Sequence, residues 1–360
     1  MKICLYNVTT AIKIGGIETF YWEIARELQK RGIDVEIISG IGNQIKYKDI
    51  PIKMFSFTPR EKIIDLGNRF KKWGERISLF KNAYPYLKKQ HYDFFLIHKP
   101  LDFFTAYFMK KANPNTKIIF VSGGEDFYGF DKFFSKYIDF MFAVSKNNAK
   151  KIKQRYNRTV KILPNGVDVQ EFKPNETYRK LFRKKYDLEN KKTLISVGRI
   201  VGWKGYQLVI EALKELDNFY YIVIGCGEYL DELKTLAKKL NIENRILFLG
   251  AIDNQELPKY LNMGDIFIQP SIGHEAFGIT IIEAMACNLP VVASKNGGIV
   301  DIIKDKKNGY MFEINNIEDM IEKILWIDKN QDILKPREFI KENFTWTNST
   351  NILLRSINCI

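Results

Sequence analysis

The sequence contains few cysteines and histidines, and it lacks a long apolar run. Its 360 residues include three histidines and four cysteines, at positions 4, 226, 287 and 359. The cysteines are far apart and match no metal-ligand spacing, so neither a zinc site nor a disulfide framework is expected, and a reducing cytoplasm fits best. No apolar run is long enough to span a bilayer, and the chain opens with MKICLYN rather than with a charged-then-apolar leader. We therefore expect a cytoplasmic protein.

Acidic residues are scarce relative to basic ones. Lysine and arginine total 56 against 42 aspartates and glutamates, which gives a net charge of +14. A basic surface can serve nucleic acid, anionic lipid or a phosphorylated substrate, although most of these lysines are typical of solvated helix faces. With 46% hydrophobic residues, the chain can bury full cores in roughly two domains of about 150 residues each.

One stretch, residues 264–298 (GDIFIQPSIGHEAFGITIIEAMACNLPVVASKNGG), carries most of the chemical information. Its pattern predicts a strand at 266–268, a loop, a helix at 279–287 and a second strand at 291–293. The first amides of a helix lack internal partners and bind phosphate, and Gly278 just before the helix lets a ligand approach closely. Glu275 precedes the helix and Glu283 lies inside it, so the carboxylates could bind hydroxyls on the two sides of a diphosphate. An ordinary helix start with two solvated glutamates is the alternative.

The full string resembles the Glu-x7-Glu signature of retaining GT-B glycosyltransferases of family 4, here EAFGITIIE followed by AMACNLPVVAS. The resemblance implies that Glu275 contacts the donor sugar and that Glu283 contacts the ribose. It also implies that the amides around Phe277, Gly278 and Ile279 hold the diphosphate.

The N-terminal region predicts the opening of a doubly wound α/β domain: a strand at 3–6, a glycine turn, a helix and a strand at 35–38. Gly15 and Gly16 in that turn resemble the glycine pair with which the family approaches the donor phosphates. A tight turn explains the pair equally well. It is not the fuller dinucleotide fingerprint, so no nicotinamide cofactor is expected.

Residues 60–90 are basic and aromatic. Nine lysines and arginines face three acidic residues there, interleaved with Phe70, Trp73, Phe80, Tyr84 and Tyr86. Such a segment can lie on an anionic membrane surface, and one hypothesis is that it docks the enzyme where a lipid-linked acceptor resides. The alternative is a pair of helices packed on the sheet with their lysines in water.

Two further strands of the first half, at 94–97 and 118–121, end in candidate acceptor contacts. The first ends at His98, where the family often has a histidine; a packed or capping histidine is equally plausible. The second runs into Ser122-Gly123-Gly124-Glu125-Asp126, where many relatives place a histidine that reaches the reaction centre. Glu125 and Asp126 could contact the acceptor instead, although Asp126 could equally cap a helix.

The turn PNGVD at 164–168 marks the predicted crossing between domains. Pro-Asn-Gly is a strong turn signal, and the segment resembles the family's NGVD turn. We predict an N-terminal acceptor-binding domain at 1–165 and a nucleotide-sugar-binding domain at 166–340. A C-terminal helix at 341–360 is expected to cross back onto the first domain, anchored by Trp346.

The second half repeats the strand-and-helix pattern and adds two cations. A strand at 194–197 is followed by Gly198-Arg199 and Trp203-Lys204-Gly205, which resembles the family's VGR…KG motif. Arg199 and Lys204 could neutralise a diphosphate and stabilise a departing nucleotide, or they could be solvated surface residues. Gly225 follows the next strand, and Ile252 follows a strand whose end lies, by resemblance, beside the nucleobase.

Together these features predict a GT-B fold, in which two Rossmann-like doubly wound domains face each other across a cleft. Ligands bind such sheets at the carboxyl ends of their strands, where Gly15, Arg199, Gly225 and Glu275 are all expected. The predicted function is a retaining hexosyltransferase that needs neither metal nor cofactor and uses a UDP- or GDP-linked sugar. The expected acceptor is a glycan or lipid-linked saccharide of cell-surface polysaccharide or glycoconjugate synthesis, which would place the enzyme at the inner face of the membrane.

Two other functions stay open. A sugar-nucleotide epimerase shares the GT-B architecture. A non-enzymatic, basic nucleic-acid-binding protein would use the positive charge directly. Against the second, the basic residues are spread over both halves and no nucleic-acid module is recognisable.

Overall fold

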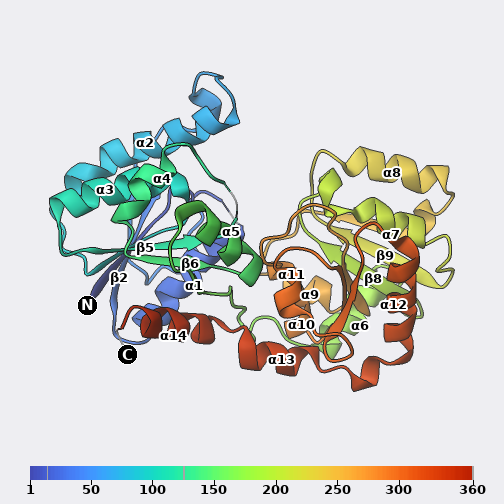
Figure 1. Cartoon of the computed structure of the whole chain (residues 1–360). Helices are drawn as coiled ribbons and strands as arrows, with labels where there is room; N and C mark the ends of the chain where they lie inside the picture. Colours follow the sequence, from blue (N-terminus) through green and yellow to red (C-terminus); the bar gives the residue numbers. More distant parts are fainter. Residues whose placement is uncertain (14, 125, 359–360) are drawn as a thin grey trace. The chain divides into compact units, whose positions relative to one another are not determined.

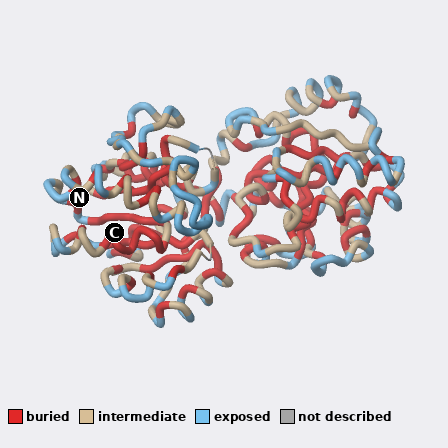
Figure 2. The backbone as a smooth tube through the Cα atoms, turned by 90° about the horizontal axis from the view of Figure 1, so that it is seen from above, coloured by how far each residue is buried: buried red, intermediate tan, exposed pale blue. Residues whose placement is uncertain are grey.

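The chain folds into two compact units, seen in a computed structural model that describes residues 1–13, 15–124 and 126–358 (Figure 1). Unit 1 contains Met1–Asn165 together with Trp346–Ile360, and unit 2 contains Gly166–Thr345. Each unit encloses its own buried core (Figure 2). Among the described residues, no helix has both the length and the apolar content needed to cross a bilayer.

Unit 1 is built on a parallel sheet whose seven strands are β1 (Lys2–Tyr6), β2 (Asp34–Gly40), β3 (Ile52–Phe55), β4 (Phe94–Ile97), β5 (Lys117–Ser122), β6 (Phe140–Ala143) and β7 (Lys161–Ile162). Their order is β3-β2-β1-β4-β5-β6-β7. Alternate residues of β1 enter different cores, Ile3 and Leu5 on one face and Cys4 and Tyr6 on the other, as a strand buried on both faces requires. The strand order reverses between β1 and β4, which is where ligands bind doubly wound sheets.

Helices cover both faces of this sheet. On one face lie α1 (Gly16–Gln29) and α14 (Trp346–Ser356), which pack against each other. The other face carries α2 (Asn68–Leu87), α3 (Phe103–Ala112) and α5 (Lys146–Tyr156) (Figure 1). The short helix α4 (Asp131–Phe134) packs against α3, and the 3-10 turns are η1 (Arg60–Lys62), η2 (Pro100–Asp102) and η3 (Ser135–Tyr137).

Unit 2 repeats this plan with six parallel strands, β8 (Lys192–Val197), β9 (Phe219–Ile224), β10 (Ile246–Gly250), β11 (Ile266–Gln269), β12 (Val291–Ser294) and β13 (Gly309–Phe312). Their order is β10-β9-β8-β11-β12-β13, so the reversal falls between β8 and β11. Apolar residues of α7 (Tyr206–Ala212), α8 (Leu230–Lys239) and α12 (Ile317–Lys329) form a core with this sheet. The other helices are α6 (Glu176–Lys185), α9 (Leu257–Leu261), α10 (Ile279–Ala286), α11 (Ile299–Ile302) and α13 (Pro336–Asn343), and the 3-10 turns are η4 (Gly202–Lys204), η5 (Glu243–Arg245) and η6 (Gln331–Ile333).

The chain passes between the units twice, after Asn165 and after Thr345. The two passes lie side by side in unit 2, where Val167 forms a parallel bridge with Thr345 and its N–H donates to the Phe344 carbonyl (2.9 Å). Beyond the second pass, α14 returns the chain to the core of unit 1.

The predicted pair of doubly wound, Rossmann-like domains is confirmed, and three local details differ. The segment at 60–90 holds one 20-residue helix, α2, instead of a pair, because Leu79, Ala83 and Leu87 continue one buried face along it. Asp126 caps no helix, since α4 begins at Asp131 with Phe130 as its N-cap. The edge strand β3 was not predicted, because its residues are only half-buried or exposed and show little alternation.

Candidate active site

In unit 2, the candidate residues follow the two central strands where the strand order reverses. Arg199 and Lys204 follow β8, and Glu275 follows β11, the strand paired with it. Parallel strands bring their carboxyl ends to one edge of the sheet, and the connecting loops diverge at the reversal. The pairing of β8 with β11 therefore brings together two motifs that are 71 residues apart in the sequence.

Lys204 and Glu275 form an ion pair in which Nζ lies 2.5 Å from Oε2. Both side chains are largely shielded from solvent, at 12% and 16% exposure. The Lys204 ammonium also lies over the ring of Trp203, 4.9 Å from its centroid. A cation fixed in this way needs little reorganisation to stabilise negative charge that develops beside it.

Three polar side chains that the sequence analysis did not single out support Glu275. The Gln269 amide and the Ser271 hydroxyl lie 3.4 and 3.3 Å from Glu275 Oε2, and the Gln269 amide also donates to Ser271 Oγ (2.8 Å). Thr280 on α10 donates to Gln269 Oε1 (3.3 Å). This network links the end of β11 to the start of α10. The signal for it was the polar Gln-Pro-Ser at the end of an apolar strand.

Among the described residues, the helix α10 begins without a side-chain cap. Gly278 precedes it in the left-handed region (φ 108°) and offers no capping side chain. The first N–H groups of a helix have no carbonyl four residues before them within the helix, and here the third of them, from Ile281, donates to the Gly278 carbonyl (3.1 Å). Phe277 is buried against Phe344 (ring centroids 5.8 Å apart), which fixes the entry of the chain into the helix. A helix start of this kind can receive an anion.

The remaining predicted residues of unit 2 differ in their surroundings. Glu283 lies on α10 and is buried, Arg199 is exposed, and Ile252 is half-buried in the loop after β10. Gly225 serves the packing of neighbouring loops: its φ is 142°, and a Cβ there would lie 1.9 Å from the Gly198 carbonyl oxygen. Its N–H donates to the Gly250 carbonyl (2.8 Å). We expected Gly225 at the carboxyl end of its strand, where ligands bind, and the group that approaches it there is the loop after β8.

Tyr206 is a further polar group close to the site. Burial raises the pKa of its hydroxyl above the usual value, and the negative charge of Glu275 raises it further. Tyr206 is therefore a neutral hydroxyl at neutral pH.

In unit 1, the predicted glycine pair lies at the corresponding reversal point, after β1. Gly16 begins α1, and the place that a Cβ of Gly15 would take lies 2.8 Å from Glu18 Oε2. The Thr9 hydroxyl donates to the same carboxylate. A carboxylate in the first turn of a helix is favoured by the helix dipole. A phosphate at Gly15 would therefore require Glu18 to turn away. Glu18 was not predicted as a site residue.

His98 follows β4, the strand beside β1. It is buried against Phe20 and Tyr21 (ring centroids 5.3 and 6.0 Å away), and its Nδ1 has no hydrogen-bond partner among the described residues. Gly123, at the end of β5, leaves room for the ring, because a Cβ there would lie 2.5 Å from His98 Nε2. Burial lowers the pKa of His98 to about 3, helped by the positive charges of Lys99 and Arg76. The imidazole is therefore neutral.

Asp126 lies in the loop after β5 and is held by two lysines. Its carboxylate lies 3.0 Å from Lys99 Nζ and 3.7 Å from Lys72 Nζ. Burial opposes its ionisation, but Lys99 and then Lys72 bring the pKa of Asp126 below its usual value. Asp126 is therefore a paired anion. Glu125, the other predicted acceptor contact, lies outside the described residues.

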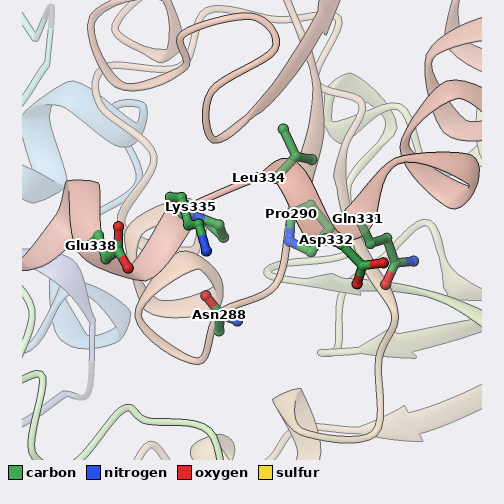
Figure 3. A pocket seen from close by; sticks show the side chains of 8 residues that line it. Asn288, Pro290, Gln331, Asp332, Leu334, Lys335 and Glu338 are labelled. Carbon is green, nitrogen blue, oxygen red and sulfur yellow. The ribbon is translucent and has the colours of Figure 1, made fainter.

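A hollow of about 330 Å³ in unit 2 contains none of the predicted site residues (Figure 3). It lies at the opposite edge of the sheet, since Pro290 of its lining precedes β12 and Asn288 follows α10. Ligands of doubly wound sheets bind at the carboxyl ends of the strands. We therefore place the candidate site at the loops after β8 and β11.

Metal-binding groups do not cluster in the part of the chain that the structure describes: no set of three or more His, Cys, Asp or Glu side chains there could hold an ion. Cys4, Cys226 and Cys287 are free thiols.

Two doubly wound units, each with candidate residues at its strand-order reversal, define a GT-B fold. Solved structures agree at the level of the fold. Sucrose-phosphate synthase from Thermosynechococcus elongatus superposes with a TM-score of 0.83 at 17% identity, covering 99% of this chain and 98% of that one. Anabaena Alr3699/HepE in complex with UDP-glucose gives 0.83 at 19% identity over the whole of both chains.

Family models identify both parts of the chain. Residues 178–346 match the model described as Glycosyl transferases group 1, and residues 14–171 match Glycosyltransferase Family 4. The chain therefore carries a glycosyltransferase group 1 domain preceded by a family 4-like domain.

Curated relatives match mostly over part of their length. The GDP-mannose-dependent alpha-(1-6)-phosphatidylinositol monomannoside mannosyltransferase of Mycobacterium tuberculosis is 27% identical over 52% of this chain and 53% of its own. The alpha-monoglucosyldiacylglycerol synthase of Streptococcus pneumoniae is 33% identical over 42% of this chain and 36% of its own. An uncharacterized glycosyltransferase of Methanocaldococcus jannaschii, MJ1069, is 26% identical over 93% of both chains. This chain thus spans about half the length of the mycobacterial enzyme.

Proposed function

We propose that this protein is a retaining glycosyltransferase that moves a hexose from a nucleoside diphosphate sugar to an acceptor hydroxyl. The observation that carries the proposal is the Lys204–Glu275 ion pair at the strand-order reversal of unit 2. A shielded cation and a carboxylate lie there beside the uncapped start of α10. These are the groups needed to bind a diphosphate that carries sugars on both sides.

The roles follow from charge and position. Lys204 and the exposed Arg199 neutralise the diphosphate and stabilise the departing nucleotide, together with the opening amides of α10. Glu275 accepts hydrogen bonds from hydroxyls of the transferred sugar, and Glu283 accepts them from the ribose. The nucleobase, uracil or guanine, lies at the loop around Ile252. Lys204 and Arg199 supply the positive charge that a metal would otherwise provide.

The reaction retains configuration at the anomeric carbon. The bond from this carbon to the donor phosphate oxygen breaks, and the acceptor oxygen bonds on the same face. The acceptor proton passes to the departing phosphate oxygen, so no enzymatic base is required. A double displacement would instead need a free carboxylate beneath the sugar, and Glu275 is engaged with Lys204.

The acceptor in this proposal is a saccharide or a lipid-linked saccharide, bound by unit 1 near His98 and Asp126. Support comes from relatives whose names specify a phosphatidylinositol mannoside and a diacylglycerol glycolipid. We place the enzyme in the cytoplasm, peripheral at the inner face of the membrane. The free thiols of the described cysteines are compatible with that compartment.

Replacement of Lys204 tests the proposal. Nucleotide sugars, including UDP-glucose and GDP-mannose, are first screened by thermal shift to find the donor. Lys204→Ala should then lower turnover of that donor by about 10²–10³-fold, because a preorganised charge-stabilising donor is lost. Lys295→Ala is the matched control, since this exposed lysine pairs only with the exposed Glu313 among the described residues. It should leave turnover unchanged.

Three outcomes would contradict the proposal. They are wild-type turnover by a folded Lys204→Ala variant, conversion of the donor to an isomer without acceptor, and no binding of any nucleoside diphosphate. The second would identify an epimerase. Thermal unfolding of both variants verifies that they are folded.

A further inference from the structure

Four large apolar side chains are exposed within ten residues, two just before α2 and two in its first turns. Ile64 is 77% exposed and Leu66 67%, and Phe70 and Trp73 are each 37% exposed. The rings of Phe70 and Trp73 lie 6.1 Å apart. The segment before α2 turns back on the helix, since Lys71 pairs with Asp65 (2.8 Å) and Ile63 packs against Gly74. We call these four side chains the apolar tip.

Cations flank the apolar tip in the sequence. Lys62 and Arg69 are exposed on either side of Ile64 and Leu66, and Lys72 lies on the next turn of α2. The Arg69 guanidinium lies 5.8 Å from the ring of Tyr128. Apolar side chains within a basic rim match a bilayer that has hydrocarbon beneath anionic headgroups.

Aromatic contacts connect this region with α4. The ring of Tyr128 stacks with that of Phe130 (6.0 Å), and Phe130 contacts Phe134 (6.4 Å). Next to it, Phe133 is exposed and lies under the Lys136 ammonium, 4.5 Å from its ring centroid. The basic and aromatic character thus continues beyond α2.

The apolar tip also lies near the candidate acceptor residues of unit 1. Lys72, one residue before Trp73, lies 3.7 Å from Asp126, and Lys99 reaches the same carboxylate. A lipid bound at the tip would therefore present its headgroup close to the loop after β5.

We propose that the apolar tip inserts into the headgroup region of an anionic bilayer while the exposed cations beside it, Lys62 and Arg69, bind its phosphates. This inference deepens the proposed function, because it names the surface from which a lipid-linked acceptor would reach unit 1. Nucleic acid fits less well: it would engage the cations but leave Ile64 and Leu66 without an apolar partner. Inserted apolar side chains and the cations beside them are two separate contributions to membrane affinity, which together allow stable, reversible binding of the protein to a bilayer.

Vesicle sedimentation of the full chain tests the surface. The wild type should bind vesicles of phosphatidylcholine with phosphatidylglycerol about tenfold or more tightly than vesicles of phosphatidylcholine alone. Ile64→Ser/Leu66→Ser/Phe70→Ser should lose about tenfold or more of this binding. Leu181→Ser/Ile333→Ser is the matched control, because both residues are exposed apolar side chains of unit 2. It should bind like the wild type.

Trp73 reports insertion directly. Bromine on the lipid acyl chains should quench tryptophan fluorescence of the wild type. This quenching should largely disappear in Trp73→Phe, which keeps an aromatic ring and should still sediment with the vesicles. Quenching that persists in Trp73→Phe, or vesicle binding equal in the apolar-tip variant and the wild type, would overturn the proposal. Equal binding of neutral and anionic vesicles would also overturn it.

The same variants separate this inference from the proposed function. Thermal shift by the nucleotide found in the donor screen, and transfer to a soluble saccharide acceptor, should be unchanged in the apolar-tip variant. Vesicle binding without nucleotide binding would leave the surface standing and refute the glycosyltransferase. Nucleotide binding without vesicle binding would refute the membrane surface and leave the glycosyltransferase proposal standing.

Discussion

At the scale of single residues, charge pairing decides how the candidate site is prepared. Lys204 and Glu275 lie in separate loops, yet their charged groups pair at 2.5 Å in a region shielded from water. A buried unpaired charge would be costly, so the pair holds both side chains in one place without a ligand. Gln269 and Ser271 restrict the carboxylate further.

His98 gives a prediction about pH at this scale. Its pKa of about 3 in the folded chain lies below that of an exposed histidine, near 6.5, so the unfolded chain binds a proton that the folded chain does not. The contribution of neutral His98 to the free energy of unfolding is fully present above pH ~6.5. It is lost as the pH falls towards 3, by up to about 1.4 kcal/mol per pH unit. His98→Gln should flatten this slope in urea unfolding measured between pH 7 and 5.

The slope is the informative readout, because the variant can also change stability at all pH values. Protonation of Asp126 also lowers the stability of the folded chain. Because the pKa of Asp126 is below its usual value, that loss falls at more acidic pH. Identical slopes for wild type and His98→Gln would show that His98 is not buried as the neutral form.

At the scale of elements, the loops after β9, β8 and β10 are held together through the backbone. Gly225 contacts the Gly198 carbonyl where any side chain would collide, and it donates to Gly250. The loop that carries Arg199 is thereby fixed from one side, while the Lys204–Glu275 pair links the loop after β8 to the loop after β11. Close packing of loops, as well as their sequence, positions the candidate site.

Gly225→Ala tests this packing. The new methyl group would meet backbone at 1.9 Å in a conformation with φ of 142°, so the free energy of unfolding should fall by about 3 kcal/mol or more. Gly250→Ala is the control, since it has a positive φ (72°) but open space around its Cβ position. It should cost only about 1–2 kcal/mol. Equal losses, measured by chemical denaturation, would mean that steric contact with Gly198 is unimportant.

At the scale of the whole molecule, the last helix belongs to the core of the first unit. Trp346, Leu353 and Leu354 of α14 are buried with residues of α1 and β1, and the Trp346 ring lies 6.1 Å from that of Phe20. Residues from the two ends of the chain therefore form one core. The core of unit 1 is therefore not complete until α14 has joined it.

Trp346→Ala should destabilise unit 1 by about 3–5 kcal/mol, because it leaves a large cavity between α14 and α1. Hydrogen exchange should accelerate in β1 and β2 of unit 1 and stay near the wild-type rate in β8 and β9 of unit 2. Trp326→Ala should accelerate exchange in β8 and β9 and leave β1 and β2 near the wild-type rate, since Trp326 packs against Tyr310 in unit 2. Equal acceleration in both units for either variant would contradict this assignment.

Much of the fold could be predicted from local patterns. The apolar runs at 3–6, 94–97, 194–197 and 266–268 each correspond to a strand, because strands buried on both faces are almost wholly apolar. The start of α10 was also predictable, since Gly278 followed by a helical apolar pattern marks it locally. The partners of Glu275, the role of Glu18 and the neutral state of His98 were not predictable, because each depends on residues brought close only by folding.

The sequence by itself determined the two doubly wound units, the glycine before α10 and the types of charged side chain available for a diphosphate. It did so because hydrophobic periodicity, turn residues and side-chain chemistry are properties of short segments. Only the tertiary structure decided that Lys204 meets Glu275, that Gly225 serves a neighbouring loop and that Ile64, Leu66, Phe70 and Trp73 stay exposed. Those outcomes depend on strand order and on which surfaces remain uncovered after packing, and no short segment encodes either one.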